Sequence, residues 1–457
     1  MKIEQIYTSC LSQGSYYIVS EKEAVIIDPL RETQQYIDKA KKDGVKIKYV
    51  FETHFHADFV SGHIDLARNT GAEIIFGPNA QTDYPVHNAK DSEIFNVGKI
   101  KIKAIHTPGH TPESTCYLLS DENGKNKAIF TGDTLFIGDV GRPDLATSSN
   151  VTTEDLAGIL FDSLRNKILP LDDDIIVYPA HGAGSSCGKN LSKETFSTLG
   201  IQKKTNYALR ENMSKQEFIS ELLDGMPTPP RYFKENAMMN KQGYNSFDDV
   251  IRQGDRALDI SEFKNFLLNP DIILLDVRHQ KDFIKKHIPN SIFIGLNGSF
   301  APWVGSIIGD TNKKIVLITP KGKENEAVTR LSRVGFDNCL GYLDGGFLSW
   351  KNSGNKIEII NNISPLDFTN IKDEVFTLDV RKKSETSLSS LESSIKIPLS
   401  VLESKIDHLD SNDNIYIHCA GGYRSMIAAS ILKRNGFNQI VDINKGYSGI
   451  QKCLINS

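Results

Sequence analysis

The stretch THFHADFVSGH at residues 53–63 places His54, His56 and Asp58 two positions apart. Alternate residues of an extended segment face the same side, so two such imidazoles can reach one ion. Imidazole and carboxylate are ligands that suit zinc or iron. A loop that holds two metals would usually carry a further His at position 59, but the chain has Phe59, whose ring cannot coordinate. The stretch therefore predicts a metal loop that is one ligand short of a two-metal site.

Three later motifs add groups of the same kind. HTPGHT contributes His110, TGD contributes Asp133 and PAHG contributes His181. Each motif follows a segment with the alternating or apolar pattern of a β-strand, as the opening stretch follows KIKYVFET at 46–53. Loops held by a rigid sheet are where α/β proteins commonly build their sites. We therefore expect these side chains to meet at one edge of a layered α/β domain and to bind a metal.

A second centre of chemistry lies near the end of the chain, in NIYIHCAGGYRSMIAAS. A β-branched strand leads into Cys419, a glycine-containing loop, Arg424 and a predicted helix. The loop N–H groups, the helix N-terminus and the guanidinium would favour thiolate over thiol at Cys419. A thiolate can accept a sulfur atom as a persulfide.

The length of 457 residues favours about three domains. The charged fraction of 24% and the net charge of −4 fit a globular protein and give no sign of a nucleic-acid partner. The first ten residues lack the apolar core of a secretory signal, and no apolar run reaches the roughly 18 residues of a membrane span. The six scattered cysteines contain no CxxC pair, which favours a reducing, cytoplasmic location.

The C-terminal part of the chain contains an internal repeat of about 100 residues. LLDVR recurs as TLDVR, and RVGFDN recurs as RNGFNQ. Each copy reads strand, helix, strand, helix, as in a small α/β domain with a parallel sheet. The predicted domains are 1–250, 251–357 and 358–457, and 201–250 is interpreted as a largely helical connector packed on the first domain. When the two copies are aligned, Thr319 occupies the place of Cys419 and Glu324 that of Arg424, so the first copy is predicted to be inactive.

In combination, THFHAD, TPGHT, TGD and PAHG resemble the metallo-β-lactamase superfamily, which implies an αββα sandwich. Within it, the stretches ETHFHADFVSG, HTPGHTPES and GDTLFIGDVGRPD look most like persulfide dioxygenases. That resemblance implies one Fe(II) held by His54, His110 and Asp133. Zinc could replace it in a purified or crystallised sample. His56 is a further candidate ligand, and Asp58 and His181 are candidate substrate or supporting contacts.

Two more residues near this predicted centre have two interpretations each. Arg142 could pair with a substrate carboxylate or order its loop through Asp144. Cys187 could relay a sulfur atom or be a structural thiol. Both interpretations stay open for each residue, and the role of Cys10 also stays open.

LDVR followed by HCAGGYRS resembles the rhodanese domain, over about residues 360–457. Together the resemblances imply a fusion of a persulfide dioxygenase, an inactive rhodanese-like domain and an active rhodanese, as in bacterial sulfide-detoxification enzymes. Such an enzyme would oxidise a low-molecular-weight thiol persulfide with O₂ to sulfite and thiol. Cys419 and Arg424 would move sulfur between persulfide, sulfite and thiosulfate, and a homo-oligomer is plausible.

Two other functions fit the same residues. One is a zinc-dependent thioester hydrolase of the glyoxalase II type with a sulfurtransferase tail. The other is a sulfur carrier or sensor whose metal is structural, with all ligands from the protein. The carrier thiol stays open between glutathione, coenzyme A and bacillithiol, and so does the direction of the rhodanese reaction.

Overall fold

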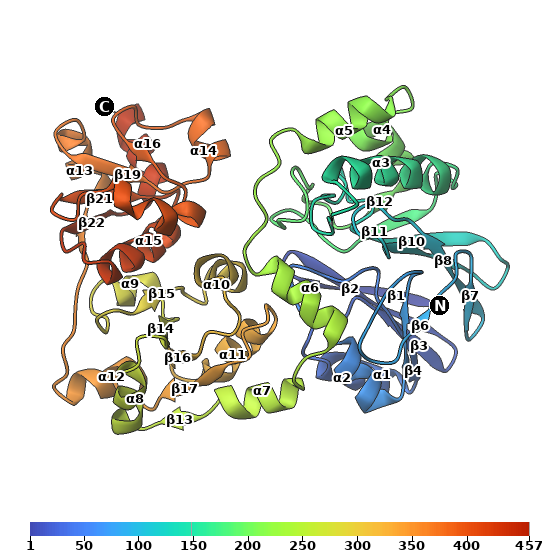
Figure 1. Ribbon diagram of the computed structural model, residues 1–457, viewed down its shortest axis with the longest axis horizontal. Helices are drawn as coiled ribbons and strands as arrows, with labels where there is room; N and C mark the ends of the chain where they lie inside the picture. Colours follow the sequence, from blue (N-terminus) through green and yellow to red (C-terminus); the bar gives the residue numbers. More distant parts are fainter. Residues whose placement is uncertain (148, 457) are drawn as a thin grey trace. The chain divides into compact units, whose positions relative to one another are not determined.

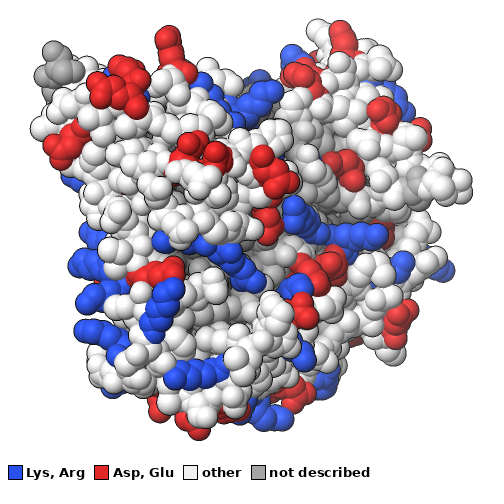
Figure 2. Space-filling model, turned by 60° about the vertical axis from the view of Figure 1, so that its left-hand side comes forward, with Lys and Arg blue, Asp and Glu red and all other residues white. Residues whose placement is uncertain are grey.

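The computed structural model describes residues 1–147 and 149–456. The chain divides into two compact units, which we describe separately (Figure 1). The N-terminal unit comprises residues 1–247 with 309–311 and 332–335, and the C-terminal unit comprises the remainder. Acidic and basic side chains intermingle on the face in Figure 2, as expected from 53 Lys and Arg against 57 Asp and Glu. Among the described residues, no helix combines the length and apolarity that a membrane crossing needs.

Two six-stranded sheets form the centre of the N-terminal unit. The first has the order β1-β2-β3-β4-β5-β6 and the second the order β12-β11-β10-β9-β8-β7. The strands of the first sheet are β1 (Lys2–Thr8), β2 (Gln13–Ser20), β3 (Glu23–Ile27), β4 (Lys46–Phe51), β5 (Glu73–Phe76) and β6 (His87–Asn88). Those of the second are β7 (Ile94–Val97), β8 (Ile100–His106), β9 (Thr115–Ser120), β10 (Asn126–Gly132), β11 (Ile176–Pro179) and β12 (Ser197–Thr198).

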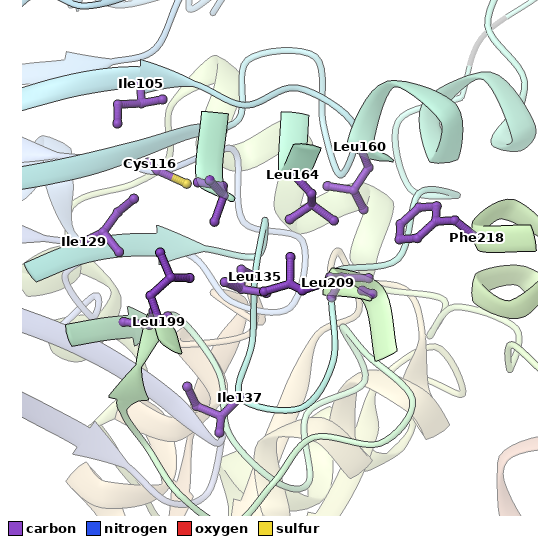
Figure 3. Close-up of a cluster of buried hydrophobic side chains, with 14 of the residues drawn as sticks. Ile105, Cys116, Ile129, Leu135, Ile137, Leu160, Leu164, Leu199, Leu209 and Phe218 are labelled. Atoms are coloured by element: carbon purple, nitrogen blue, oxygen red, sulfur yellow. The ribbon is translucent and has the colours of Figure 1, made fainter. Parts of the chain in front are cut away.

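The two sheets pack face to face. Alternate residues of each strand point to opposite sides of its sheet, so one set packs between the sheets and the other packs under helices. On β3, Val25 and Ile27 belong to the core between the sheets, which also contains Phe130 of β10. Ala24 and Ile26 of the same strand belong to the outer cluster that packs under helices. The other outer cluster covers the second sheet with side chains such as Leu160 and Phe218 (Figure 3). The predicted αββα sandwich is therefore confirmed.

The helices of this unit are α1 (Gln34–Asp43), α2 (His63–Thr70), α3 (Thr153–Ser163), η1 (Leu164–Ile168), α4 (Leu199–Thr205), η2 (Tyr207–Leu209), α5 (Lys215–Leu223) and α6 (Phe233–Gln242). The connector is helical as expected, but its first part is broken into three pieces. Asn206 ends α4 because its side chain accepts from the Ala208 N–H and donates to the carbonyl groups of Phe136 and Asp139. A capping box of Ser214 and Glu217 then starts α5.

The C-terminal unit begins with α7 (Phe247–Gly254) and contains two five-stranded sheets whose strand pairs are all parallel. Their orders, β13-β17-β16-β14-β15 and β18-β22-β21-β19-β20, are the same topology written twice. The first sheet consists of β13 (Ala257–Leu258), β14 (Ile273–Asp276), β15 (Ile292–Phe293), β16 (Ile315–Ile318) and β17 (Cys339–Leu343). The second consists of β18 (Asn361–Ile363), β19 (Phe376–Asp379), β20 (Ile395–Lys396), β21 (Ile415–His418) and β22 (Ile440–Ile443).

Helices join the strands in both copies, as the internal repeat predicts. The first copy has α8 (Ile260–Leu267), α9 (Gln280–Phe283), α10 (Phe300–Ile308), α11 (Glu324–Ser332) and α12 (Gly346–Asn352). The second has α13 (Pro365–Ile371), α14 (Lys383–Leu388), η3 (Leu399–Val401), η4 (Glu403–His408), α15 (Tyr423–Arg434) and α16 (Gly446–Asn456). We keep 251–357 and 358–457 as proposed domain ranges, and each sheet lies within one of them.

Candidate functional site

Three residues from three strand ends meet at one edge of the sandwich. His54 follows β4, His110 lies on the loop after β8, and Asp133 directly follows β10. The Nε2 atoms of His54 and His110 lie 3.8 Å and 3.5 Å from Asp133 Oδ2. All three side chains are buried, and their ligand atoms lie within 4.8 Å of one another. The structure thus brings together the two imidazoles and the carboxylate that the sequence grouped as metal ligands.

A second group faces the other oxygen of the same carboxylate. His181 Nε2 lies 3.6 Å from Asp133 Oδ1 and 3.5 Å from Asp58 Oδ2. Cys187 joins Asp133 and His181 in a set whose ligand atoms are also within 4.8 Å. Asp133 therefore stands between two candidate ligand sets, and Asp58 lies beside His181 in the second. We use the word pocket for this buried group of ligand atoms.

The polar atoms of this pocket fit a cation. Both Asp133 carboxylate oxygens, Asp58 Oδ1 and His181 Nε2 are buried without a hydrogen-bond partner among the described residues. Buried polar atoms are nearly always satisfied, and an unpaired buried carboxylate is costly. Burial opposes protonation of His181, but Asp58 and Asp133 outweigh it and raise the pKa of His181 well above its ordinary value. A metal ion would supply the positive charge that these groups require.

Hydrogen bonds on the far side of each imidazole present Nε2 to the pocket. Thr53 Oγ1 donates to Asp28 at 2.8 Å and lies 3.0 Å from His54 Nδ1, so it accepts from that ring. His110 Nδ1 donates to the Arg142 carbonyl at 2.7 Å. These contacts fix the tautomer that leaves Nε2 free for a metal. Gly141 leaves room for the His110 ring, because a Cβ there would lie 3.0 Å from His110 Nδ1 and 2.1 Å from the Asp133 carbonyl oxygen.

His56 has a different environment from His54. Its Nε2 lies 3.1 Å from Asp28 Oδ1 and 3.4 Å from Glu52 Oε2, behind the metal loop. Burial disfavours the charged ring, but these two carboxylates outweigh it and raise the pKa of His56 to about 10. The buried Phe59 ring packs against His56, with centroids 4.4 Å apart. His56 also groups with Asp58 and His181 as a candidate ligand set, so the structure places it between an acidic pair and the pocket.

Arg142 is buried and fully engaged in ordering its loop. Its guanidinium donates twice to Asp144, at 2.6 and 2.7 Å, and also to the carbonyls of Ser186 and Pro227. These contacts match the loop-ordering interpretation of Arg142. Cys187 is buried at the pocket, and burial together with Asp58 and Asp133 raises the pKa of its thiol to about 12.

Asn240 of α6 is a supporting residue that the sequence did not reveal. Its amide donates to the carbonyls of His56 at 2.7 Å and Phe59 at 2.8 Å, and its oxygen accepts from the Ser61 N–H at 2.9 Å. The connector thereby holds the metal loop in shape. The separation of 184 residues from His56 left no local signal, although a buried Asn in a helix is unusual for its polarity.

Cys419 lies between β21 and α15 and is buried at 1% exposure. The Gly422 N–H donates to its sulfur at 3.1 Å, and Ser425 Oγ lies 3.7 Å from the same sulfur. The helix N-terminus adds a partial positive charge that favours an anion. Gly446 can hold this loop because a Cβ there would lie 2.3 Å from the Cys419 carbonyl oxygen. The loop therefore has the backbone geometry of an anion cradle around the sulfur.

Arg424 does not contact the sulfur but forms a bidentate pair with Glu385 of α14, at 2.6 and 2.8 Å. Glu385 was not identified from the sequence, because the two residues are 39 positions apart. The pair fixes the guanidinium beside the cysteine loop, where it adds to the positive potential.

The loop of the first repeat that corresponds to the cysteine loop has a similar backbone arrangement but different side chains. Thr319 follows β16 as Cys419 follows β21, and its hydroxyl lies 3.4 Å from a Glu324 carboxylate oxygen. Gly346 has a positive φ of 58° and approaches the Thr319 carbonyl, as Gly446 approaches that of Cys419. This loop lacks both a sulfur and a cation at these two positions.

Helix α15, which begins at the cysteine loop, is buried along most of its length. The Tyr423 hydroxyl donates to the Gly295 carbonyl at 2.6 Å, and the Phe293 N–H donates to Ser430 Oγ at 3.0 Å. Both partners belong to the first repeat, whereas the opposite side of α15 faces its own sheet. The first repeat thus supports the helix that carries the cysteine loop of the second.

Comparison with known proteins identifies both parts of the chain. Residues 10–181 match the metallo-beta-lactamase superfamily, and residues 259–353 and 365–453 match the rhodanese-like domain. A solved metallo-beta-lactamase from Staphylococcus aureus subsp. aureus COL is 33% identical with a TM-score of 0.66. That likeness covers 75% of this chain and 98% of the other.

Two curated relatives of the N-terminal unit carry different activities in their names. A probable hydroxyacylglutathione hydrolase of Schizosaccharomyces pombe is 30% identical, over 45% of this chain and 77% of the relative. The mitochondrial persulfide dioxygenase of Bos taurus is 32% identical, over 35% of this chain and 59% of the relative. Identity alone does not separate these two chemistries.

Proposed function

Because the chain belongs to the metallo-β-lactamase superfamily and continues into two rhodanese-like domains, we propose that it is a persulfide dioxygenase coupled to a sulfurtransferase. The observation that carries this proposal is the presence, on one chain, of a two-His, one-carboxylate pocket and a cysteine loop suited to sulfur. A domain that transfers sulfur could exchange substrates and products with an enzyme that oxidises sulfur. The bovine relative provides a named precedent for the oxidation step.

In this proposal His54, His110 and Asp133 hold a single Fe(II), the arrangement typical of non-haem oxygenases. The bound iron would supply the redox chemistry by which O₂ oxidises a persulfide sulfur. The overall reaction balances as RSSH + O₂ + H₂O → RSH + SO₃²⁻ + 2H⁺. Thr53 and the Arg142 carbonyl orient the two imidazoles, and the buried Phe59 fills the place of a further ligand.

The C-terminal domain would exchange sulfur through Cys419. The thiolate attacks the outer sulfur of thiosulfate, a new S–S bond forms, and the old S–S bond breaks with its electron pair leaving on sulfite. The Gly422 N–H and the α15 N-terminus stabilise the negative sulfur. Covalent fusion raises the local concentration of the shared sulfite or persulfide. Glutathione, coenzyme A and bacillithiol are the candidate carriers of the persulfide.

The decisive experiment is anaerobic purification, metal analysis and oxygen uptake with persulfides of the three thiols. We expect one iron per chain and uptake of one O₂ per persulfide. An iron-loaded sample that takes up no oxygen with any of them would overturn the dioxygenase proposal.

Phe59→His offers a sharper test of the single-metal site. The variant adds an imidazole next to Asp58 in the metal loop, so metal content should rise from one toward two ions per chain. Phe59→Leu, which adds no ligand, is the matched control and should stay at one. Two metals per chain in the unchanged protein would contradict the single-metal proposal.

A zinc thioester hydrolase is the second candidate, and one feature of the pocket favours it. Asp133 presents its second oxygen to Asp58, His181 and Cys187, so another cation could be held there. The Schizosaccharomyces pombe relative named as a hydrolase supports this alternative. Hydrolysis of an acyl-glutathione by the isolated protein, without oxygen uptake, would select it.

A further inference from the structure

A buried carboxylate lies behind the cysteine loop and has no role in the proposed chemistry so far. Asp442 is on β22 and is 4% exposed. Ser425 Oγ donates to Asp442 Oδ1 at 2.6 Å, and the same hydroxyl lies 3.7 Å from the Cys419 sulfur. The three groups therefore form a chain of hydrogen bonds from the nucleophile into the protein interior.

The environment of Asp442 differs from that of two other buried acids of this unit. Asp276 accepts two or more hydrogen bonds from Arg278, and Asp379 accepts two or more from Arg381, so each carboxylate faces a cation. In the described part of the chain, no cationic side chain pairs with Asp442, and its neighbours across the sheet are Ile417 and Asn362. Burial raises the pKa of Asp442 to about 7, although the bond from Ser425 lowers it in part. An uncompensated buried acid of this kind is costly and suggests a function.

The carboxylate occurs only in the repeat that has the cysteine. With the two repeats aligned at an offset of about 100 residues, the position of Asp442 corresponds to Tyr342. Tyr342 is partly exposed, and Thr319 stands in its repeat where the other has Cys419. Nucleophile and buried acid are thus present together in one copy and absent together from the other.

We propose that Ser425 and Asp442 form a proton relay for Cys419. This inference rests on the proposed sulfurtransferase function and adds a route for the thiol proton. Ser425 touches the reacting sulfur, and Asp442 acts through it as a positioning residue.

The relay balances as a shift of one proton. The Cys419 S–H passes its proton to Ser425 Oγ, while the Ser425 hydroxyl proton passes to Asp442 Oδ1. The result is a thiolate beside a neutral carboxyl group, with no change in total charge. The thiolate then attacks thiosulfate, forming Cys–S–S⁻ and releasing sulfite. The reverse shift restores the thiol when the persulfide sulfur has been passed on.

Two charged residues near the loop are held in ion pairs, and a nearby His is buried. Arg424 pairs with Glu385, and Asp379 pairs with Arg381. His418, which precedes the cysteine, is buried 3.8 Å from Asp379, and burial lowers its pKa. Ser425 is the group that links Asp442 to the sulfur, so the relay depends on that hydroxyl.

The test measures the pH dependence of Cys419 alkylation by iodoacetamide in the full chain, followed at the Cys419 peptide by mass spectrometry. In the unchanged protein we expect two steps, the first near pH 7, because thiol and carboxyl share a proton. Asp442→Asn should lose the first step and leave one titration. A one-step profile in the unchanged protein, or an unaltered two-step profile in Asp442→Asn, would overturn the relay.

Two substitutions at Ser425 keep the test decisive if Asp442→Asn does not fold. Ser425→Ala removes the hydroxyl between Cys419 and Asp442, so the pH profile of alkylation should show one step. Ser425→Thr retains a hydroxyl and should keep two steps. A two-step profile in Ser425→Ala would contradict the relay. Thiosulfate turnover is measured in parallel. An unchanged protein that shows two steps but transfers no sulfur would refute the proposed function and retain the relay.

Discussion

The two rhodanese-like domains share a strand order, a buried Asp–Arg pair after the second strand and a positive-φ glycine that approaches the loop. They differ in the side chains on that loop. The second has Cys419 and Arg424, and the first has Thr319 and Glu324. The contacts common to both maintain the backbone, whereas the differing residues are the ones that the proposed sulfur transfer requires. The comparison shows that the architecture of this domain persists without a cysteine and an arginine at these two positions.

The strongest test of this contrast is Cys419→Ser. Without a thiolate, thiosulfate sulfur transfer should fall by at least about 10³-fold, because the nucleophile itself is lost. Oxygen uptake with a persulfide should be unchanged, since the metal residues lie in the other unit. Cys453→Ser, at a partly exposed cysteine away from the loop, is the matched control. Loss of both activities in Cys419→Ser would contradict two separable sites.

Arg424→Ala should have the next largest effect. Removing the cation takes a stabilising charge from the anionic substrate, and we expect transfer to fall by about 10²-fold. Arg424→Lys keeps the charge but not the bidentate geometry with Glu385, so its loss should be smaller. Glu324→Gln at the equivalent place in the first domain is the control and should not alter turnover. Equal kinetics for Arg424→Ala and the unchanged protein would argue against a role for this cation.

A gain of reactivity would test the comparison from the other side. Thr319→Cys with Glu324→Arg, made in the Cys419→Ser chain, places both reactive groups on the first loop. Its new thiol should alkylate about tenfold faster at neutral pH than that of Thr319→Cys alone, because the cation replaces a carboxylate near the sulfur. Mass spectrometry of the peptide that spans the substituted loop follows the alkylation. Equal rates would mean that the first loop cannot form the cradle.

The smallest expected effect concerns stability. In the folded protein the pKa of Asp442 is raised to about 7, whereas in the unfolded chain it is about 4. The folded state therefore loses stability as the pH rises from about 4 to 7, because the carboxyl must ionise while buried. The free energy of unfolding of Asp442→Asn, relative to the unchanged protein, should therefore increase by roughly 2–3 kcal/mol between about pH 5 and pH 8. Urea denaturation at the two pH values measures this difference. Asp276→Asn, which breaks the ion pair with Arg278, should instead lower the free energy of unfolding at both pH values. A pH-independent difference for Asp442→Asn would refute the expectation.

Much of the candidate site could be predicted from the sequence because its reactive residues lie at strand ends in short motifs. His54, His110 and Asp133 were each recognisable beside an apolar or alternating strand, and the repeat revealed the paired domains. Their convergence follows from a sheet that presents several strand ends at one edge. Cys419 and Arg424 were recognisable for the same reason, since loop and helix are continuous in sequence.

The supporting residues could not be predicted because their partners are distant in sequence. Asn240 reaches His56 across 184 residues, and Glu385 reaches Arg424 across 39. Asp442 gave no signal, since a lone acid in a short strand reads as an exposed position. Helix α6 lies in the connector predicted to be largely helical, but its contact with the metal loop could not be predicted, because Asn240 makes it through hydrogen bonds to distant carbonyls.

Helix α15 is buried on the side of its own sheet and contacts the first repeat through Tyr423 and Ser430. We therefore expect the stability of the C-terminal domain to depend on the first repeat. Excised at about residue 358, it would expose the apolar flank of the helix that carries its nucleophile, and such surfaces promote aggregation. Removing the first repeat would therefore leave the helix behind the Cys419 loop without two of its hydrogen-bond partners.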